Sequence, residues 1–86
     1  MRKYIVLVCF FLFTEYTMAD DGLWKRIFIF QSEMAKKGNV EAIYKLGEMY
    51  EEGLGVARNI SQAKKFYVDA AKQGHSKARK KLAYIQ

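Results

Sequence analysis

The sequence predicts an all-α protein built as a short stack of antiparallel helix pairs. Its 86 residues contain no proline, and glycine marks the breaks between helical segments, at Gly38, at Gly53 with Gly55, and at Gly74. Between these breaks apolar residues recur three or four positions apart, which is the spacing of one helix face. The segments that begin at Gly38 and Gly74 also match each other, which gives a period of 36 residues. A repeat of this length made of two helices is typical of a solenoid.

The N-terminal segment has the pattern of a signal peptide. The positively charged start Met1-Arg2-Lys3 precedes an unbroken apolar run over residues 4–13. This run is too short to cross a bilayer, because a spanning helix needs about 20 residues. Thr17 and Ala19 are small residues at the positions that a signal peptidase recognises. We therefore expect a signal peptide over 1–19 and export to the periplasm or the extracellular space, rather than a retained anchor or a buried helix.

The only cysteine, Cys9, lies inside the apolar run of the expected signal peptide. The residues beside it do not fit a lipoprotein signal, so lipidation is not expected. Cleavage after Ala19 would leave a mature chain with no thiol. Such a chain has no disulfide, no thiolate nucleophile and no sulfur ligand for a metal.

Four helices are expected after the signal peptide, each bounded by a glycine break. Their predicted ranges are 23–37, 40–52, 60–73 and 75–86. The period divides the chain into a degenerate half-repeat helix over 20–37, a complete repeat over 38–73, and the opening helix of a second repeat over 74–86 that caps the stack. The first helix is assigned to a degenerate repeat because Phe30 falls on Phe66, and Ala35 on Ala71, at the same offset.

Each helix of the complete repeat has one face suited to packing. The helix over 40–52 carries Ile43, Leu46, Gly47 and Tyr50 on one face, and the helix over 60–73 carries Ala63, Phe66, Tyr67, Ala70 and Ala71. Gly47 and the pair Ala70-Ala71 are expected where helix axes approach closely, since larger side chains would hold the axes apart. Asn59 or Ser61 is expected to cap the second of these helices, because either side chain can accept a hydrogen bond from a free backbone N–H.

These positions together resemble the Sel1-like repeat, a relative of the tetratricopeptide repeat. The matching residues are Ala42, Leu46, Gly47, Tyr50, Gly53, Gly55, Val56, Ala63, Phe66, Tyr67, Ala70, Ala71, Gly74, Ala78 and Leu82. Arg58-Asn59 departs from the family pattern, which usually has an acidic residue before the second helix. The resemblance implies a right-handed α/α solenoid that works in protein–protein interaction, often as an adaptor or scaffold. Bacterial members of that family are frequently exported and act at the envelope or in host contact, so the resemblance is consistent with export.

The residues of this pattern are expected to pack rather than to react. Leu46, Tyr50, Val56, Phe66, Tyr67 and Leu82 are expected to fill the core between helices. Gly53 and Gly55 are expected to form a turn and not a phosphate-binding loop, because no strand precedes them and no Lys-Ser/Thr follows them.

Reactive groups are too sparse for a catalytic or metal site. His75 is the only histidine, and no second histidine or carboxylate pair stands beside it at metal-ligand spacing. We expect a structural or surface role for it. Ser32 and Ser61 have no neighbouring base in the sequence. The sequence therefore predicts no catalytic residue, no metal, no cofactor and no enzyme activity.

A concave surface is the expected place for binding a partner protein. In stacked repeats the first helix of each pair lines this surface. Counting from Leu46 and Leu82 places there Glu41, Tyr44, Glu48, Glu51, Glu52, Lys77, Lys80 and Tyr84. Tyrosine supplies contact area with a polar end, and charges steer the approach of a partner. The alternative is that these charges form an ordinary solvated face.

Charge is divided unevenly along the chain. Residues 20–57 carry five Lys/Arg against seven Asp/Glu, a net charge of −2, whereas residues 58–86 carry eight against one, a net charge of +7. The basic C-terminal helix makes an anionic membrane surface an alternative partner, although its apolar residues are already assigned to packing. Nucleic acid is not expected, because no binding motif is present. An immunity or inhibitor protein is a further alternative, and self-association would cover the apolar residues Trp24, Phe28 and Phe30.

Overall fold

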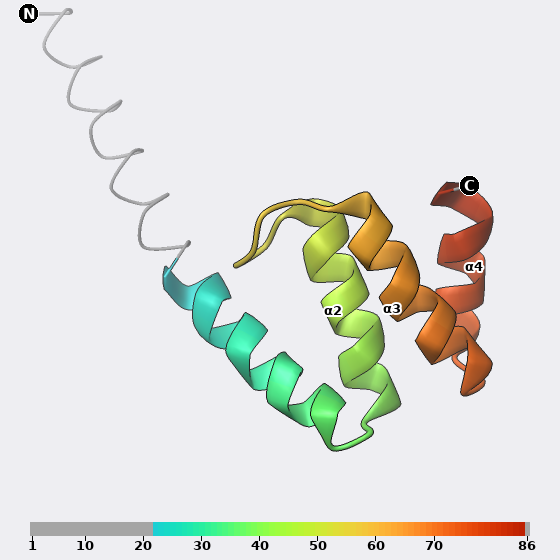
Figure 1. Ribbon diagram of the computed structural model, residues 1–86, viewed down its shortest axis with the longest axis horizontal. Helices are drawn as coiled ribbons and strands as arrows, with labels where there is room; N and C mark the ends of the chain where they lie inside the picture. The colour runs from blue at the N-terminus through green and yellow to red at the C-terminus, as the bar shows by residue number, and fades with distance from the viewer. Residues whose placement is uncertain (1–21, 86) are drawn as a thin grey trace, which may run out of the picture.

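A computed structural model describes residues 22–85, and all their regular structure is helical. The first helix occupies residues 22–36, and α2 Val40–Glu52, α3 Ile60–Lys72 and α4 Ser76–Ile85 follow it. Successive helices run antiparallel, with α3 beside both α2 and α4 (Figure 1). The predicted ranges agree with these bounds to within one or two residues. The predicted signal peptide over 1–19 lies outside the described residues.

Asparagine side chains start both helices of the central pair. The Oδ1 atom of Asn39 accepts a hydrogen bond of 3.1 Å from the backbone N–H of Ala42, three residues into α2. Asn59 makes the same 3.1 Å contact with the backbone N–H of Gln62 in α3. Of the two caps proposed from the sequence, Asn59 is confirmed. These bonds satisfy backbone donors that have no partner inside the helix.

The α2–α3 loop turns sharply and packs against the first helix. Gly53 ends α2 with φ of 74°, a left-handed conformation that favours a residue without a Cβ. Gly55 also has a positive φ, and a Cβ added there would collide with the backbone carbonyl of Trp24. The predicted turn at Gly53 and Gly55 is thus confirmed. Its second glycine is fixed by contact with the first helix as well as by the turn.

α2 and α3 approach each other closely at Gly47. The Tyr67 side chain of α3 is fully buried against Gly47 of α2, and a Cβ added to Gly47 would lie 2.5 Å from the Tyr67 ring. The Tyr44 ring lies 5.6 Å from the Tyr67 ring. The close approach predicted at Gly47 is therefore confirmed, and the residue that requires it is Tyr67.

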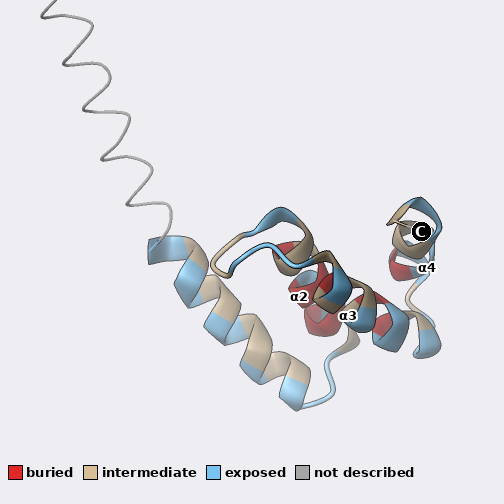
Figure 2. Cartoon of the chain, turned by 45° about the horizontal axis from the view of Figure 1, so that its top comes forward, coloured by how far each residue is buried: buried red, intermediate tan, exposed pale blue. Residues whose placement is uncertain are grey.

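Small and aromatic residues join the outer helices to this centre. Ala70 of α3 and Ala78 of α4 are both fully buried and belong to one core cluster. On the other side, the ring of Phe28 in the first helix meets the ring of Tyr50 edge-on at 5.7 Å. Tyr50 in turn stacks on Phe66 of α3 at 5.6 Å. Figure 2 places the buried residues in α2 and α3, with a smaller share in α4.

The predicted core residues lie between the helices, but fewer of them are fully buried than expected. Leu46 and Tyr67 are buried, whereas Tyr50, Val56, Phe66 and Leu82 are half-buried. Within residues 22–85, no helix combines the length and the apolar character needed to span a bilayer.

The apolar surface of the first helix differs from the prediction. Trp24 and Phe28 were expected to be exposed, but both are half-buried, because Trp24 lies beside the Gly55 loop and Phe28 packs on Tyr50. Phe30 is exposed as expected, together with Leu23 and Ile29. The self-association hypothesis therefore concerns a different set of residues from the one that the sequence indicated.

Replacing Gly47 with alanine should destabilise the protein, although alanine favours a helix. Alanine gains about 1 kcal/mol of helix propensity over glycine, but overfilling a packed interface costs about 1–3 kcal/mol. We expect a net loss of about 1 kcal/mol in the free energy of unfolding, measured by urea denaturation followed by circular dichroism. Gly22→Ala is the matched control, because nothing lies within 4 Å of a Cβ added there. A Gly47→Ala protein more stable than the wild type would contradict the close contact.

Candidate functional site

A groove lies between α2 and α4. It encloses about 300 Å³ and is lined by Tyr44, Glu51, Lys77, Lys80, Lys81, Tyr84 and Ile85. Five of these were predicted from the repeat period to share the concave surface: Tyr44, Glu51, Lys77, Lys80 and Tyr84. The α2 and α4 helices are first helices of successive repeats, so the fold places the groove where such repeats have their concave side.

The other predicted residues, Glu41, Glu48 and Glu52, do not line this groove. Glu41 is exposed and pairs with His75 at the start of α4. Glu48 and Glu52 line a separate hollow between α2 and the first helix. Their part in one inner surface with Glu51 stays a prediction, which the lining of this groove does not support. Helical spacing assigns a residue to a broad face, and the packing of α4 covers only part of that face.

Tyr44 forms the floor of the groove and is not an exposed contact. Its side chain is only 5% exposed, because its ring stacks on His75 at 4.4 Å and lies 5.6 Å from Tyr67. Its hydroxyl donates a 3.3 Å hydrogen bond to Glu48. Burial, reinforced by the charge of the Glu48 carboxylate, raises the pKa of Tyr44 to about 12. The hydroxyl therefore stays a protonated donor at neutral pH.

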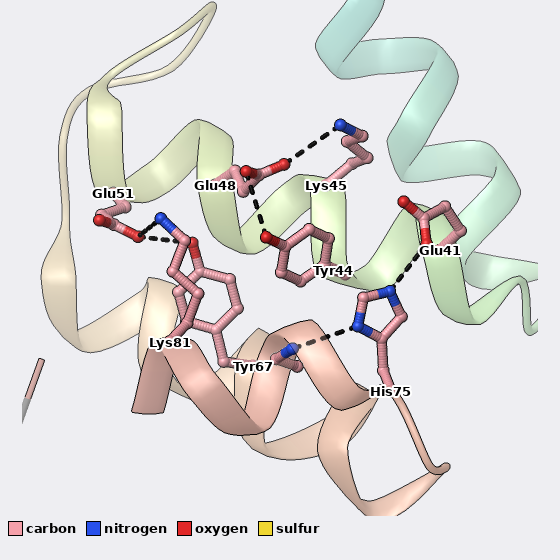
Figure 3. A network of polar contacts seen from close by, with 9 residues as sticks. Glu41, Tyr44, Lys45, Glu48, Glu51, Tyr67, His75 and Lys81 are labelled. Carbon is pink, nitrogen blue, oxygen red and sulfur yellow. Dashed lines mark hydrogen bonds and ion pairs between the residues drawn. The ribbon is translucent and has the colours of Figure 1, made fainter. Parts of the chain in front are cut away.

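A polar network beneath the groove ties α2, α3 and α4 together (Figure 3). The Tyr67 hydroxyl of α3 donates a 2.6 Å hydrogen bond to Oε1 of Glu51 in α2. The Nζ atom of Lys81 in α4 lies 3.4 Å from the same oxygen. Burial raises the pKa of Tyr67, and the hydrogen bond to Glu51 raises it further, so Tyr67 remains a donor. The carboxylate of Glu51 is thus held by two partners within the fold.

His75 joins α4 to α2 and also caps α4. Its Nδ1 atom accepts a 3.2 Å hydrogen bond from the backbone N–H of Ala78, and its Nε2 atom lies 2.7 Å from Oε2 of Glu41. Because Nδ1 accepts, the neutral ring carries its proton on Nε2 and donates it to Glu41. The structural role expected for His75 agrees with these contacts. The repeat period overlays His75 on the cap residue Asn39, and that overlay was the sequence signal for its capping role.

The contact with His75 also affects the charge of Glu41. The hydrogen bond from His75 lowers the pKa of Glu41, and the nearby charges of Lys45 and Lys77 lower it further. The slight burial of the carboxyl group acts in the opposite direction. Glu41 is therefore held in its ionised form as a partner for α4.

The contacts of His75 and the distribution of acidic side chains bear on the catalytic and metal sites considered from the sequence. Both ring nitrogens of His75 are already engaged, by Ala78 and Glu41, so His75 is not paired with Ser32 or Ser61 as a base. Across residues 22–85, no group of three or more His, Cys, Asp or Glu side chains is placed to hold a metal ion.

The complete repeat is also recognised by comparison with known families. A sequence profile described as "Sel1 repeat" matches residues 40–75, which run from the start of α2 to His75. These residues form a Sel1 repeat. The match covers the α2–α3 pair with its Gly47–Tyr67 contact, and it ends at the residue that caps α4. Sel1 repeats generally mediate protein–protein interaction and are typically non-catalytic.

Several larger proteins contain a segment similar to this chain. Chitin synthase regulatory factor 3 of Schizosaccharomyces pombe is 50% identical over 48 residues, which is 56% of this chain and 5% of that protein. Protein SHC1 of Saccharomyces cerevisiae is 40% identical over 58 residues, 67% of this chain and 11% of that protein. DAP3-binding cell death enhancer 1 of Mus musculus is 42% identical over 48 residues, 56% and 9% respectively.

The chain therefore spans only a small part of each of these relatives. The similarity supports a shared repeat and does not extend to the whole of those proteins. No solved structure matches the chain significantly.

Removing the charge of Glu41 should reduce stability at neutral pH but not in acid. The pKa of Glu41 is lowered by folding from its ordinary value of 4.5. Its contribution is therefore present above that value and is lost as the pH falls through the lower, folded pKa. Because Glu41 is exposed, we expect Glu41→Gln to cost only about 0.5 kcal/mol at neutral pH. Urea denaturation across this pH range measures the difference.

Glu52→Gln is the control for this measurement, because Glu52 is exposed and lies away from α4. Its effect should be smaller and should not follow the titration of Glu41. A Glu41→Gln variant that differs from the wild type equally at neutral and acidic pH would show that the contact with His75 does not stabilise the fold.

Proposed function

We propose that this protein is a non-catalytic protein-interaction module, an adaptor or scaffold, that binds a partner protein in the groove between α2 and α4. The observation that carries the proposal is the groove itself. It combines a tyrosine floor with a rim where Tyr84 is 88% exposed. An aromatic side chain that the fold leaves in water offers a large contact area to a partner at little cost in conformational entropy.

The family supports this function at a general level, because Sel1 repeats bind other proteins. The names of two relatives, a regulatory factor and a DAP3-binding protein, describe regulation and binding. We transfer only the general property of partner binding, because the chain covers so little of those proteins.

Export to the periplasm or the extracellular space is part of the proposal. It is supported by the charged start Met1-Arg2-Lys3, the apolar run over 4–13 and the small residues Thr17 and Ala19. An exported adaptor would meet its partner at the envelope or outside the cell. Fractionation of cells, with N-terminal sequencing of the chain found outside the cytoplasm, would test cleavage after Ala19.

Capture of a partner should depend on the rim of the groove. Immobilised protein is exposed to an envelope extract, and retained proteins are identified by mass spectrometry. We expect Tyr84→Ala/Lys80→Glu to weaken retention of the partner at least about tenfold, which corresponds to about 1.4 kcal/mol. Tyr44 is left unchanged because it is buried in the fold.

Val68→Ala/Lys65→Glu is the matched control, because both residues are exposed on α3, away from the groove. It makes the same kinds of substitution and should retain the partner. Equal retention by the wild type and both variants would contradict binding in the groove.

A further inference from the structure

The acidic side chains of α2 are largely occupied by contacts within the fold. Glu51 is held by Tyr67 and Lys81, Glu41 is held by His75, and Glu48 contacts Tyr44 and lies 3.3 Å from Lys45. The sequence suggested a groove with one acidic and one basic wall. In the structure two of these residues, Glu41 and Glu51, hold α4 in place.

The basic side chains of α4 are used less completely. Lys77 and Lys80 line the groove and are exposed, and neither forms an ion pair or a side-chain hydrogen bond with another residue in 22–85. Lys81 is the only lysine of this wall that pairs with Glu51. The charge that the groove offers to a ligand is therefore positive.

We propose that the occupant of the groove is an acidic segment of a partner protein that carries an aromatic or aliphatic anchor. This inference rests on the proposed function and specifies the chemistry of the partner. Carboxylates of the segment meet Lys77 and Lys80, and the anchor lies on Tyr44 and Ile85 beside Tyr84. A volume of about 300 Å³ is at the lower end of the range for ligand pockets, about 300–1,000 Å³. It suits one or two side chains and not a folded domain.

A basic segment does not fit the same groove. Its only nearby carboxylate would be Glu51, which already accepts from Tyr67 and pairs with Lys81. The charge of the Glu51 carboxylate is thus already balanced in part by Lys81 before a ligand arrives. Lysines on both sides of the interface would also repel each other.

An anionic membrane fits α4 less well than an acidic segment does. Binding to a membrane surface requires a broad apolar face that can enter the lipid. In α4, Ala78 is fully buried, and Leu82 and Ile85 are half-buried against the core. Tyr84 is the one large hydrophobic residue of α4 that is strongly exposed. The apolar residues Tyr44 and Ile85 also lie inside the groove, where a flat lipid surface would not reach them.

Selection from a phage-displayed library of random peptides tests this proposal. The immobilised protein is the bait, and the peptide that it enriches most is labelled and titrated by fluorescence anisotropy. We expect enriched peptides to combine several Asp or Glu residues with at least one aromatic or large aliphatic residue. Lys77→Gln/Lys80→Gln should weaken their binding about tenfold, which corresponds to about 1.4 kcal/mol. Added salt should weaken the binding to the wild type.

Lys64→Gln/Lys65→Gln is the matched control, because it removes the same charge from α3, outside the groove. It should leave peptide binding unchanged. Enrichment of neutral or basic peptides, or no enrichment at all, overturns the proposal. So does binding to phosphatidylserine vesicles that needs Lys77 and Lys80 while no acidic peptide binds, which would make α4 a lipid-binding surface.

Failure of this inference can be separated from failure of the proposed function. Suppose that a partner from the extract is lost with Tyr84→Ala alone but retained with Lys77→Gln/Lys80→Gln. The groove then binds protein, but its occupant is not an acidic segment. If no partner depends on the groove, the proposed function fails as well.

Discussion

The fold depends on the placement of one fully buried tyrosine, Tyr67, where three helices meet. Its ring fits against Gly47 in α2, so α2 and α3 approach closely only because position 47 has no side chain. Its hydroxyl must find an acceptor, because an unsatisfied buried hydroxyl is costly. Glu51 supplies that acceptor at 2.6 Å. The same carboxylate attracts Lys81, so the contact that satisfies Tyr67 also holds α4.

This arrangement determines the character of the groove. Glu51 faces the groove but is bound from below by Tyr67 and from the side by Lys81. At the other end of the α2–α4 contact, Glu41 and His75 make a second link. The acidic helix and the basic helix therefore neutralise each other where they meet. The lysines that are left over, Lys77 and Lys80, give the exposed part of the groove its positive charge.

Much of the fold could be predicted because it is encoded locally. Glycine breaks, asparagine caps and the spacing of apolar residues place each helix, and Asn59, one of the two caps considered for α3, is the residue that caps it. The period of 36 residues also placed Lys77 and Lys80 on the same face as Tyr44 and Glu51. Repeats have this property, since each unit meets its neighbour in the same way.

What could not be predicted are contacts between residues distant in the sequence. Periodicity tells which face a residue is on but not which side chain covers it. Tyr44 was expected in solvent, yet Tyr67 and His75 enclose its ring from two other segments of the chain. Glu52 was expected beside Glu51, but the first helix and not α4 borders it. Similarly, Trp24 is covered by a loop whose path depends on Gly55.

A double-mutant cycle between Tyr67→Phe and Glu51→Gln tests the central claim most directly, namely that Glu51 belongs to the fold and not to the ligand. The free energy of unfolding is measured for the wild type, both single variants and the double variant. Because a hydrogen bond to a charged group contributes about 1.5–3 kcal/mol, we expect the two losses to be coupled by at least about 1 kcal/mol. Losses that simply add would mean that Tyr67 and Glu51 act independently. The carboxylate of Glu51 would then be available to a ligand, and its negative charge would offset that of Lys77 and Lys80 in the groove.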